Sequence, residues 1–178
     1  MRAARRIPLP AAALALVLAT LASGCGNDGA DRGYVVPETL CGVTVAPELL
    51  EPLLPPGEEI TVSTHTPAGS ITACEVSVDG KEAFSVRREW WEEGWSARRF
   101  AESQAYVDPE KESGGGGLVW SGRGAVAAVE CRDPDFAGQA LFVVAKMEAD
   151  GRSDAPAVRG FTEAYGEAYA GSDACSGP

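Results

Sequence analysis

The stretch SITACEVSVDGKEAFSVRREWW, residues 70–91, decides the fold class. Two runs in which apolar and polar residues alternate, 70–78 and 82–91, flank the dipeptide Asp79-Gly80. Alternation with a period of two is typical of β-strands, and Asp-Gly between two such runs is a strong hairpin signal. The stretch therefore predicts two antiparallel strands joined by a tight turn.

The register of this hairpin follows from the parity of its apolar residues. A two-residue Asp79-Gly80 turn would set Phe84 opposite Glu75. A three-residue loop, residues 78–80, instead sets Cys74 opposite Phe84 and gathers the apolar side chains on one buried face: Cys74, Phe84, Val86 and Trp90. Because a slip of one residue moves every side chain to the other face of the sheet, we expect the three-residue loop, with Gly80 in the left-handed region.

Further helices and strands are expected on both sides of this hairpin. Helical spacing of leucines marks residues 47–54, and alternation marks a strand over 60–64. Residues 96–107, capped by Ser96, are expected to form a second helix, and 118–120, 125–132 and 139–148 three more strands. Asp154 caps a last helix with one apolar face made of Val158, Phe161, Tyr165 and Tyr169. This order predicts an α+β fold: an antiparallel sheet of about six strands, with two to three helices packed largely on one face.

The first 24 residues have the pattern of a secretory signal peptide. Residues 1–6 contain three arginines and no acidic residue, and residues 11–22 are an apolar run. That run is too short for the ~20 residues that cross a bilayer as a helix, and it ends in small residues rather than basic ones. We therefore expect residues 1–24 to be removed from a secreted protein.

The end of this segment, Leu21-Ala22-Ser23-Gly24-Cys25, resembles the lipobox of bacterial lipoproteins. The resemblance implies a diacylglyceryl group on the Cys25 thiol and cleavage just before Cys25. Ordinary secretion is the alternative, because residues 22–24 also fit a small-residue cleavage site. The chain has five cysteines, and lipidation of Cys25 leaves an even number for pairing outside the cell. We expect a protein held by lipid on the extracytoplasmic face of the cell membrane, where two acyl chains suffice for stable anchoring.

Composition divides the mature chain into a short tether and one acidic domain. Residues 25–39 are expected to be the lipidated cysteine and a flexible tether, and residues 40–178 a single ectodomain. Without its signal peptide the chain keeps 12 basic and 26 acidic residues, a net charge of −14 with His65 neutral. Phosphates repel such a domain, so nucleic acid is excluded as a partner.

The four remaining cysteines, Cys41, Cys74, Cys131 and Cys175, allow three pairings. Pairing by neighbourhood gives Cys41–Cys74 and Cys131–Cys175, each of which would tie a helix end to the sheet. A zinc site is the alternative use of these residues. The cysteines are not closely paired and no Cys-x-x-Cys occurs, so we expect two disulfides.

With these features the chain resembles uncharacterised actinobacterial secreted lipoproteins that have a lipobox, an acidic tether and a four-cysteine α+β ectodomain. The stretches that carry the resemblance are residues 40–42, residues 73–80, residues 129–131 and the helix that ends in Cys175. More loosely, the chain resembles the extracytoplasmic sensor domains of bacterial transmembrane kinases. These motifs are structural, so the resemblance implies a fold and a location but no activity.

Few residues have the pattern of a chemical site. His65 is the only histidine, so it is the only imidazole base that a Ser-His-Asp hydrolase could use. Glu130, Asp133 and Asp135 lack the alternating oxygen ligands of a calcium loop, and the glycine-rich residues 113–117 lack the lysine of a phosphate loop. We predict no catalytic residue, no metal site and no cofactor.

Trp90, Trp91 and Trp95 are the most suggestive feature for binding. By alternation Trp90 and Trp91 point to opposite faces, so that one of them leaves the core, and exposed tryptophan marks binding patches. The leading hypothesis is a non-enzymatic binding or sensing domain for envelope proteins or an extracellular ligand. The alternatives are a carrier of a small apolar ligand or lipid and, more remotely, a hydrolase that uses His65.

Overall fold

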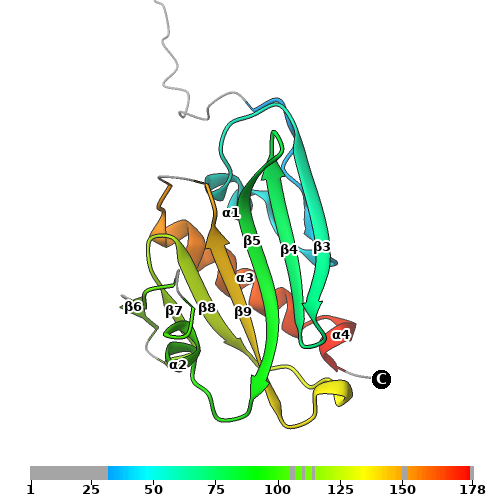
Figure 1. Cartoon of the computed structure of the whole chain (residues 1–178), viewed down its shortest axis with the longest axis vertical. Coiled ribbons are helices and arrows are strands. Elements are labelled where there is room, and N and C mark those ends of the chain that lie inside the picture. The colour runs from blue at the N-terminus through cyan, green and yellow to red at the C-terminus, as the bar shows by residue number, and fades with distance from the viewer. Residues whose placement is uncertain (1–31, 105–106, 110, 114, 150–151, 177–178) are drawn as a thin grey trace, which may run out of the picture.

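The structure is a computed structural model that describes residues 32–104, 107–109, 111–113, 115–149 and 152–176. The predicted signal peptide, Cys25 and residues 26–31 of the predicted tether lie outside these residues. The described chain forms one antiparallel sheet in the strand order β3-β4-β5-β9-β8-β7-β6, with the longest helix behind it (Figure 1). The α+β class and its antiparallel sheet are therefore as predicted, with seven strands in place of about six.

The strands of this sheet are β3 Ile60–Ala68, β4 Ile71–Val78, β5 Lys81–Glu92, β6 Lys111–Glu112, β7 Leu118–Trp120, β8 Gly124–Val129 and β9 Gln139–Met147. A separate two-stranded ribbon is formed by β1 Thr39–Leu40 and β2 Val43–Thr44. The helices are α1 Pro47–Leu50, α2 Ala97–Ala101, α3 Ala155–Ala170 and α4 Asp173–Ser176, with 3-10 turns η1 Glu51–Leu53 and η2 Pro134–Phe136. The predicted helix over 47–54 is thus split between α1 and η1.

The β4–β5 hairpin has the predicted buried face but a different turn. Val78 pairs with Lys81, so the turn is the two residues Asp79 and Gly80, both left-handed at φ 50° and 72°. The expected three-residue loop is therefore wrong. A bulge at Ala83 follows: Ser77 pairs with Glu82 and Val76 with Phe84. Because Ala83 is an extra residue on β5, Phe84 and Val86 lie on the same face of the sheet as Cys74 and Val76.

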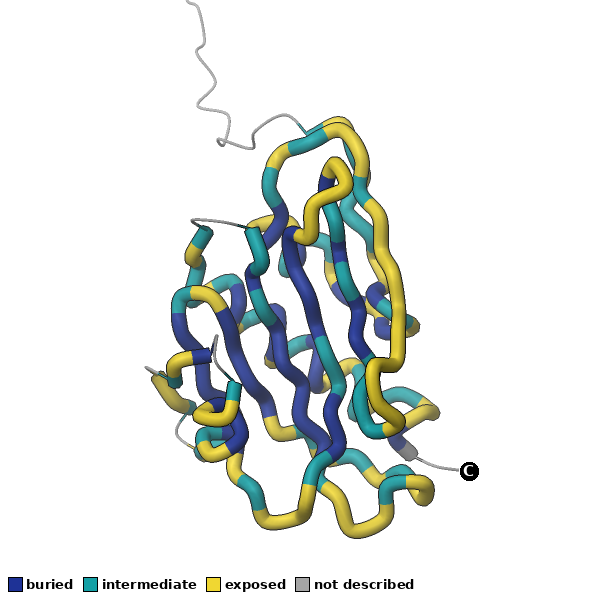
Figure 2. The backbone as a smooth tube through the Cα atoms, in the orientation of Figure 1, coloured by how far each residue is buried: buried dark blue, intermediate teal, exposed yellow. Residues whose placement is uncertain are grey.

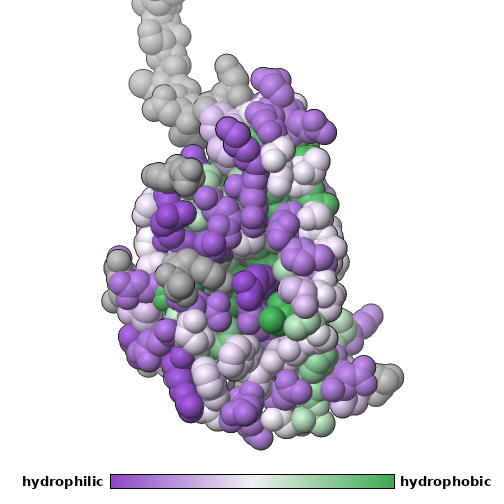
Figure 3. Space-filling model, viewed as in Figure 1, coloured by the Kyte–Doolittle hydropathy of each residue, from purple (hydrophilic) through white to green (hydrophobic). Residues whose placement is uncertain are grey.

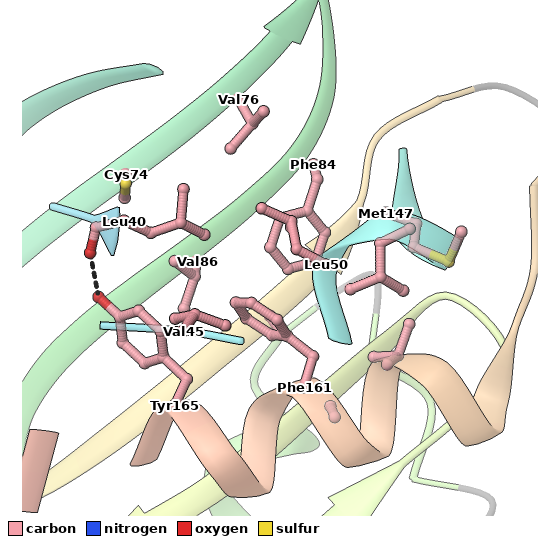
Figure 4. Packing of buried hydrophobic residues seen from close by; sticks show 14 of the residues in the cluster. Leu40, Val45, Leu50, Cys74, Val76, Phe84, Val86, Met147, Phe161 and Tyr165 are labelled. Carbon is pink, nitrogen blue, oxygen red and sulfur yellow. Dashed lines mark hydrogen bonds between the residues drawn. The ribbon is translucent and has the colours of Figure 1, made fainter. Parts of the chain in front are cut away.

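The main core lies between the sheet and α3 and is filled by large side chains. Phe161 and Tyr165 of α3 point toward Phe84 and Val86 of β5, and the rings of Phe84 and Phe161 meet edge to face at 4.7 Å (Figure 4). Asp154 caps α3 as predicted, accepting from the backbone N–H of Ala157 at 3.0 Å.

A second, smaller core covers the opposite face of the sheet. There Phe100 of α2 stacks on Phe142 of β9 with ring centroids 4.5 Å apart. Helices therefore lie on both faces, with α1 and α3 on one and α2 on the other. Ser96 caps α2 as predicted, but the helix ends at Ala101 rather than continuing to 107. The Ser103 hydroxyl donates to the Phe100 carbonyl at 2.6 Å, which favours a turn over further helix.

Both predicted disulfides are present. Cys41–Cys74 ties the turn between β1 and β2 to β4, and Cys131–Cys175 ties the chain after β8 to α4. Cys41, Cys74, Cys131 and Cys175 are all used in this way, so the zinc alternative is wrong.

The last part of the predicted tether is held against the domain. Arg32 pairs with Glu51 at 2.8 Å and also donates to the carbonyl of Leu54, while the Tyr34 hydroxyl donates to the Pro55 carbonyl. Only residues 26–31 of the predicted tether lie outside the described chain.

Candidate functional site

The three tryptophans of interest gather at one end of the sheet, where β5 ends. Trp90 points to the α3 side, is 7% exposed and stacks on Phe136 of η2 with centroids 4.8 Å apart and planes 6° apart. Trp91 points to the other side, where α2 lies, so the two rings are on opposite faces as alternation predicted. Trp90 is therefore a core residue of this end of the molecule, and Trp91 is available for a surface role.

Trp91 and Trp95 form a partly exposed aromatic pair. Their rings lie 5.0 Å apart, and Trp91 also meets Phe100 edge to face at 5.3 Å. The guanidinium of Arg99 lies over the Trp95 ring, 4.2 Å from its centroid. Packing on α2 fixes the two rings before any partner arrives, which lowers the entropic cost of binding through them.

A hollow of about 540 Å³ adjoins this pair. Its walls come from the turn between β3 and β4, the end of β5 and the start of β9: Ser70, Ile71, Trp90, Trp91, Glu92, Glu93, Gly138 and Gln139. Hydroxyl, amide and carboxylate groups therefore surround aromatic rings, a mixture typical of ligand sites. We call the hollow together with Trp95 and Arg99 the tryptophan surface.

An ion pair between a buried carboxylate and a partly exposed guanidinium supports the tryptophan surface from beneath. Glu89 is 1% exposed, forms an ion pair with Arg87, and accepts a hydrogen bond from the Trp91 indole N–H at 3.2 Å. A buried carboxylate is tolerated only where charges and donors satisfy it. Glu89 therefore fixes the orientation of the Trp91 ring.

The tryptophan surface lies at the opposite end of the sheet from the start of the described chain. Gly33 donates to the Gly57 carbonyl at 2.8 Å, and Gly57 lies against Val78 and Asp79 at the β4–β5 turn. From that turn β5 runs the length of the molecule to Trp91 (Figure 1). Ten residues of strand at ~3.3 Å each separate the two ends by roughly 33 Å.

His65 and the acidic residues of the turn after β8 do not form a catalytic or metal-binding arrangement within the described residues. His65 of β3 pairs with Glu75 of β4, Nε2 to Oε1 at 3.4 Å, and both side chains reach solvent. Hydrophilic residues cover much of the face of the molecule that Figure 3 shows. The Asp133 carboxylate caps η2 by accepting from the Asp135 N–H at 2.9 Å. Within the described ranges, no group of three or more His, Cys, Asp or Glu residues could hold a metal ion.

A second hollow of about 350 Å³ lies between β8 and α3. Its floor is made of small and apolar residues, among them Leu118, Ala127, Val129 and Gly166. The carboxylates of Glu130, Glu163 and Glu167 stand around it. Gly166 lets α3 approach closely, because a Cβ there would lie 3.1 Å from Val129.

Sequence reasoning missed Arg99 of the tryptophan surface and two residues that support its rings, Glu89 and Phe136. Glu89 could have been found, since it shares the parity of Trp91 and so lies beside it on β5. Arg99 could also have been found, because it lies four residues after Trp95, although the helix begins only between them. Phe136 had no signal, because it sits in an irregular loop whose path alternation does not predict.

Comparison with known proteins finds no family model, no curated protein and no solved structure that matches the chain. The resemblance to actinobacterial lipoproteins and kinase sensor domains therefore stays a prediction. No helix in the described ranges is long and apolar enough to cross a membrane.

Proposed function

We propose that the protein is a lipid-anchored extracytoplasmic binding domain that presents the tryptophan surface away from its own membrane. The observation that carries the proposal is the position of the Trp91–Trp95 pair, partly exposed and roughly 33 Å of strand away from the end where the chain leaves toward Cys25. A partner in the envelope or outside the cell could reach that end without displacing the anchor.

The chemistry of the surface favours recognition over catalysis. Paired rings of fixed orientation supply contact area at low entropic cost, and tryptophan and arginine are enriched among the residues that dominate binding energy. Glu92, Glu93 and Gln139 around the hollow give hydrogen-bond acceptors that fix a ligand's orientation. The proposed partner is an envelope protein or an extracellular ligand with both an apolar surface and hydrogen-bond donors.

The test compares partner capture by the full chain and by a variant with Trp91→Ala and Trp95→Ala. Both proteins are crosslinked in intact cells, and captured partners are quantified. The double variant should lose the partners that the wild type enriches. Arg159→Ala is the control. Arg159 of α3 lies over the ring of Trp120 on β7, as Arg99 lies over the ring of Trp95, but outside the tryptophan surface. Equal capture by the double variant would refute the proposed surface.

The anchoring half of the proposal has its own test. Metabolic labelling with a fatty acid should mark the wild type and not Cys25→Ala, and the variant should be released or remain an uncleaved precursor. Equal labelling of the wild type and the variant would refute lipidation of Cys25. The binding surface would still be tested by the capture experiment.

The hollow beside α3 favours a second candidate, a carrier of a small apolar ligand. Its floor is apolar and its volume of about 350 Å³ falls at the lower end of small-molecule sites. Large side chains fill the core between the sheet and α3, so a ligand would have to lie in this hollow. Native mass spectrometry of the protein purified from its own cells tests it: retained lipid supports a carrier, and a mass without ligand contradicts it.

A further inference from the structure

Strand β3 forms one edge of the sheet and is exposed along nearly its whole length. It pairs with β4 on one side, and no described strand pairs with its other side. Every residue from Thr61 to Ala68 is exposed, so the strand stands out beside the buried central strands (Figure 2). Its outer row of backbone donors and acceptors is open to a partner.

This edge lacks the usual protection against pairing with another chain. Edge strands are normally kept short or interrupted by charged side chains, proline or bulges. The other edge, β6, has two residues, whereas β3 has nine, ITVSTHTPA, with no lysine, arginine or acid among them. Protection begins only near its end, where Pro67 lies in a register shift between His65 and Ala68.

The hydrogen-bond pattern identifies the outward-facing groups. Asp79 donates its N–H to the Glu59 carbonyl at 2.9 Å, which fixes the parity of the β3–β4 ladder. In antiparallel pairs, hydrogen-bonded positions alternate with positions whose groups point away. Thr61 and Ser63 therefore bond to β4, while the N–H and C=O groups of Val62 and Thr64 point outward.

We propose that the outer edge of β3 binds an extended segment of another protein as an additional antiparallel strand. Such pairing takes its affinity from main-chain hydrogen bonds. The exposed carboxylates of Glu58 and Glu59 stand where β3 begins, and Glu75 lies on the neighbouring strand. The segment is therefore neutral or basic, rich in β-branched or hydroxyl side chains, and free of acidic residues at the end that reaches Glu58.

The anchor argues against a second copy of this chain as the occupant, a step that rests on the proposed function. If β3 paired with β3 of a second copy about a two-fold axis, the two strands would be antiparallel and the two domains would point in opposite directions. The Arg32 end of one domain would then lie far from the membrane. Seven residues from Cys25 to Arg32 reach at most ~25 Å at ~3.6 Å per residue. The domain is roughly 33 Å long along β5, so one of the two tethers would fall short.

The edge also leads to the tryptophan surface. Ser70 of the β3–β4 turn and Ile71, the first residue of β4, line the hollow beside Trp90 and Trp91. A segment that pairs with β3 and continues past Ala68 would therefore reach the hollow, so that one partner could use both sites.

Residue-resolved amide hydrogen exchange of the full-length protein in detergent tests the proposal. The probe is an eight-residue peptide of alternating threonine and valine with lysine at both ends. At nine-tenths saturation it should slow exchange of the Val62 and Thr64 amides by about tenfold. The Thr61 and Ser63 amides, already bonded to β4, should change little. The same peptide N-methylated at alternate residues, which lacks donors on the pairing edge, should have no effect.

Two variants separate backbone pairing from side-chain contact. Val62→Pro removes an outward N–H and leaves the β4 ladder intact, so it should abolish binding of the peptide, whereas Val62→Ala should retain it. If Val62→Pro does not fold, the N-methylated peptide still decides the question. The proposal is overturned if the N-methylated peptide protects equally or if protection falls outside β3. Protection of Val62 that rises with protein concentration alone would overturn it in favour of a second copy. The Trp91→Ala and Trp95→Ala variant should still bind the peptide, even if it captures no partner in cells; loss of peptide binding in that variant would overturn the edge as the binding site.

Discussion

Replacing Trp95 with alanine should cost much less stability than replacing Trp90 of β5 with alanine. Trp95 is partly exposed at the rim of the smaller core, and its ring meets the Arg99 guanidinium and the Trp91 ring. An exposed cation–π contact is worth ~0.5–1 kcal/mol and an aromatic pair ~0.5–1.5 kcal/mol. Trp95→Ala should therefore lower the free energy of unfolding by about 1–2.5 kcal/mol.

Trp90 differs because it is buried. It is 7% exposed and stacked on Phe136, and truncation of a buried tryptophan costs ~3–5 kcal/mol through lost burial and the cavity that remains. The cost of Trp90→Ala should therefore be a large share of the stability of a domain of this size, which is ~5–15 kcal/mol. The same residue type, five positions apart, thus has a structural role in one place and a surface role in the other.

Urea unfolding followed by circular dichroism measures both variants against the wild type. Arg99→Ala is the control that removes the cation alone, and it should account for ~0.5–1 kcal/mol of the Trp95 effect. If Trp95→Ala destabilises as much as Trp90→Ala, Trp95 is a core residue. The argument that its ring is kept for a partner would then be wrong.

Three further predictions concern the scaffold. Cys74→Ser and Cys131→Ser should each lower the free energy of unfolding by about 3.5–4 kcal/mol, because the disulfides close loops of 33 and 44 residues. Peptide mapping of either variant should recover the other disulfide intact. A rearranged disulfide would contradict the packing described above. Burial raises the pKa of Tyr165 above 10.0, so the stability due to its neutral form is present below pH 10.0 and is lost as the pH rises through the folded-state pKa. Tyr165→Phe should weaken this loss of stability at alkaline pH, measured by thermal melting at a series of pH values. An unchanged pH profile would refute the assignment. Gly80→Ala should lower stability by ~1–2 kcal/mol in thermal melting, because the φ angle of Gly80 is +72°. Gly69→Ala is the control and should be nearly neutral, since a Cβ there would also have open space around it. Equal effects of the two substitutions would mean that the β4–β5 turn is not as described.

The parity of apolar residues predicted the buried face of the hairpin but not its turn. A three-residue loop and a two-residue turn followed by a bulge at Ala83 give the same parity, so Cys74, Phe84 and Val86 share a face in either case. The alternation in the sequence cannot tell the two apart. The Asp-Gly dipeptide, whose residues both adopt positive φ, was the better guide.

The candidate site was predictable only where it lies on regular structure. Alternation along β5 placed Trp90 and Trp91 on opposite faces, and the structure agrees. The partner of Trp90, Phe136, comes from the loop after β8, which Cys131–Cys175 holds near α4. Its position depends on packing between segments far apart in the chain, and no local pattern predicts that. The end of α2 was missed for a related reason, because the Ser103 hydroxyl competes for a helix carbonyl.

Site-specific photo-crosslinking in living cells tests the central claim most directly. A photoreactive residue is placed in the full-length protein either at Glu93, in the tryptophan surface, or at Lys81, at the other end of β5. Both side chains are exposed, so the pair differs mainly in which end of the domain it reports. The account predicts discrete crosslinked partners from position 93 that vanish with Trp95→Ala, and few or none from position 81. Crosslinks from position 81 alone, or from both positions equally and insensitive to Trp95→Ala, would contradict it.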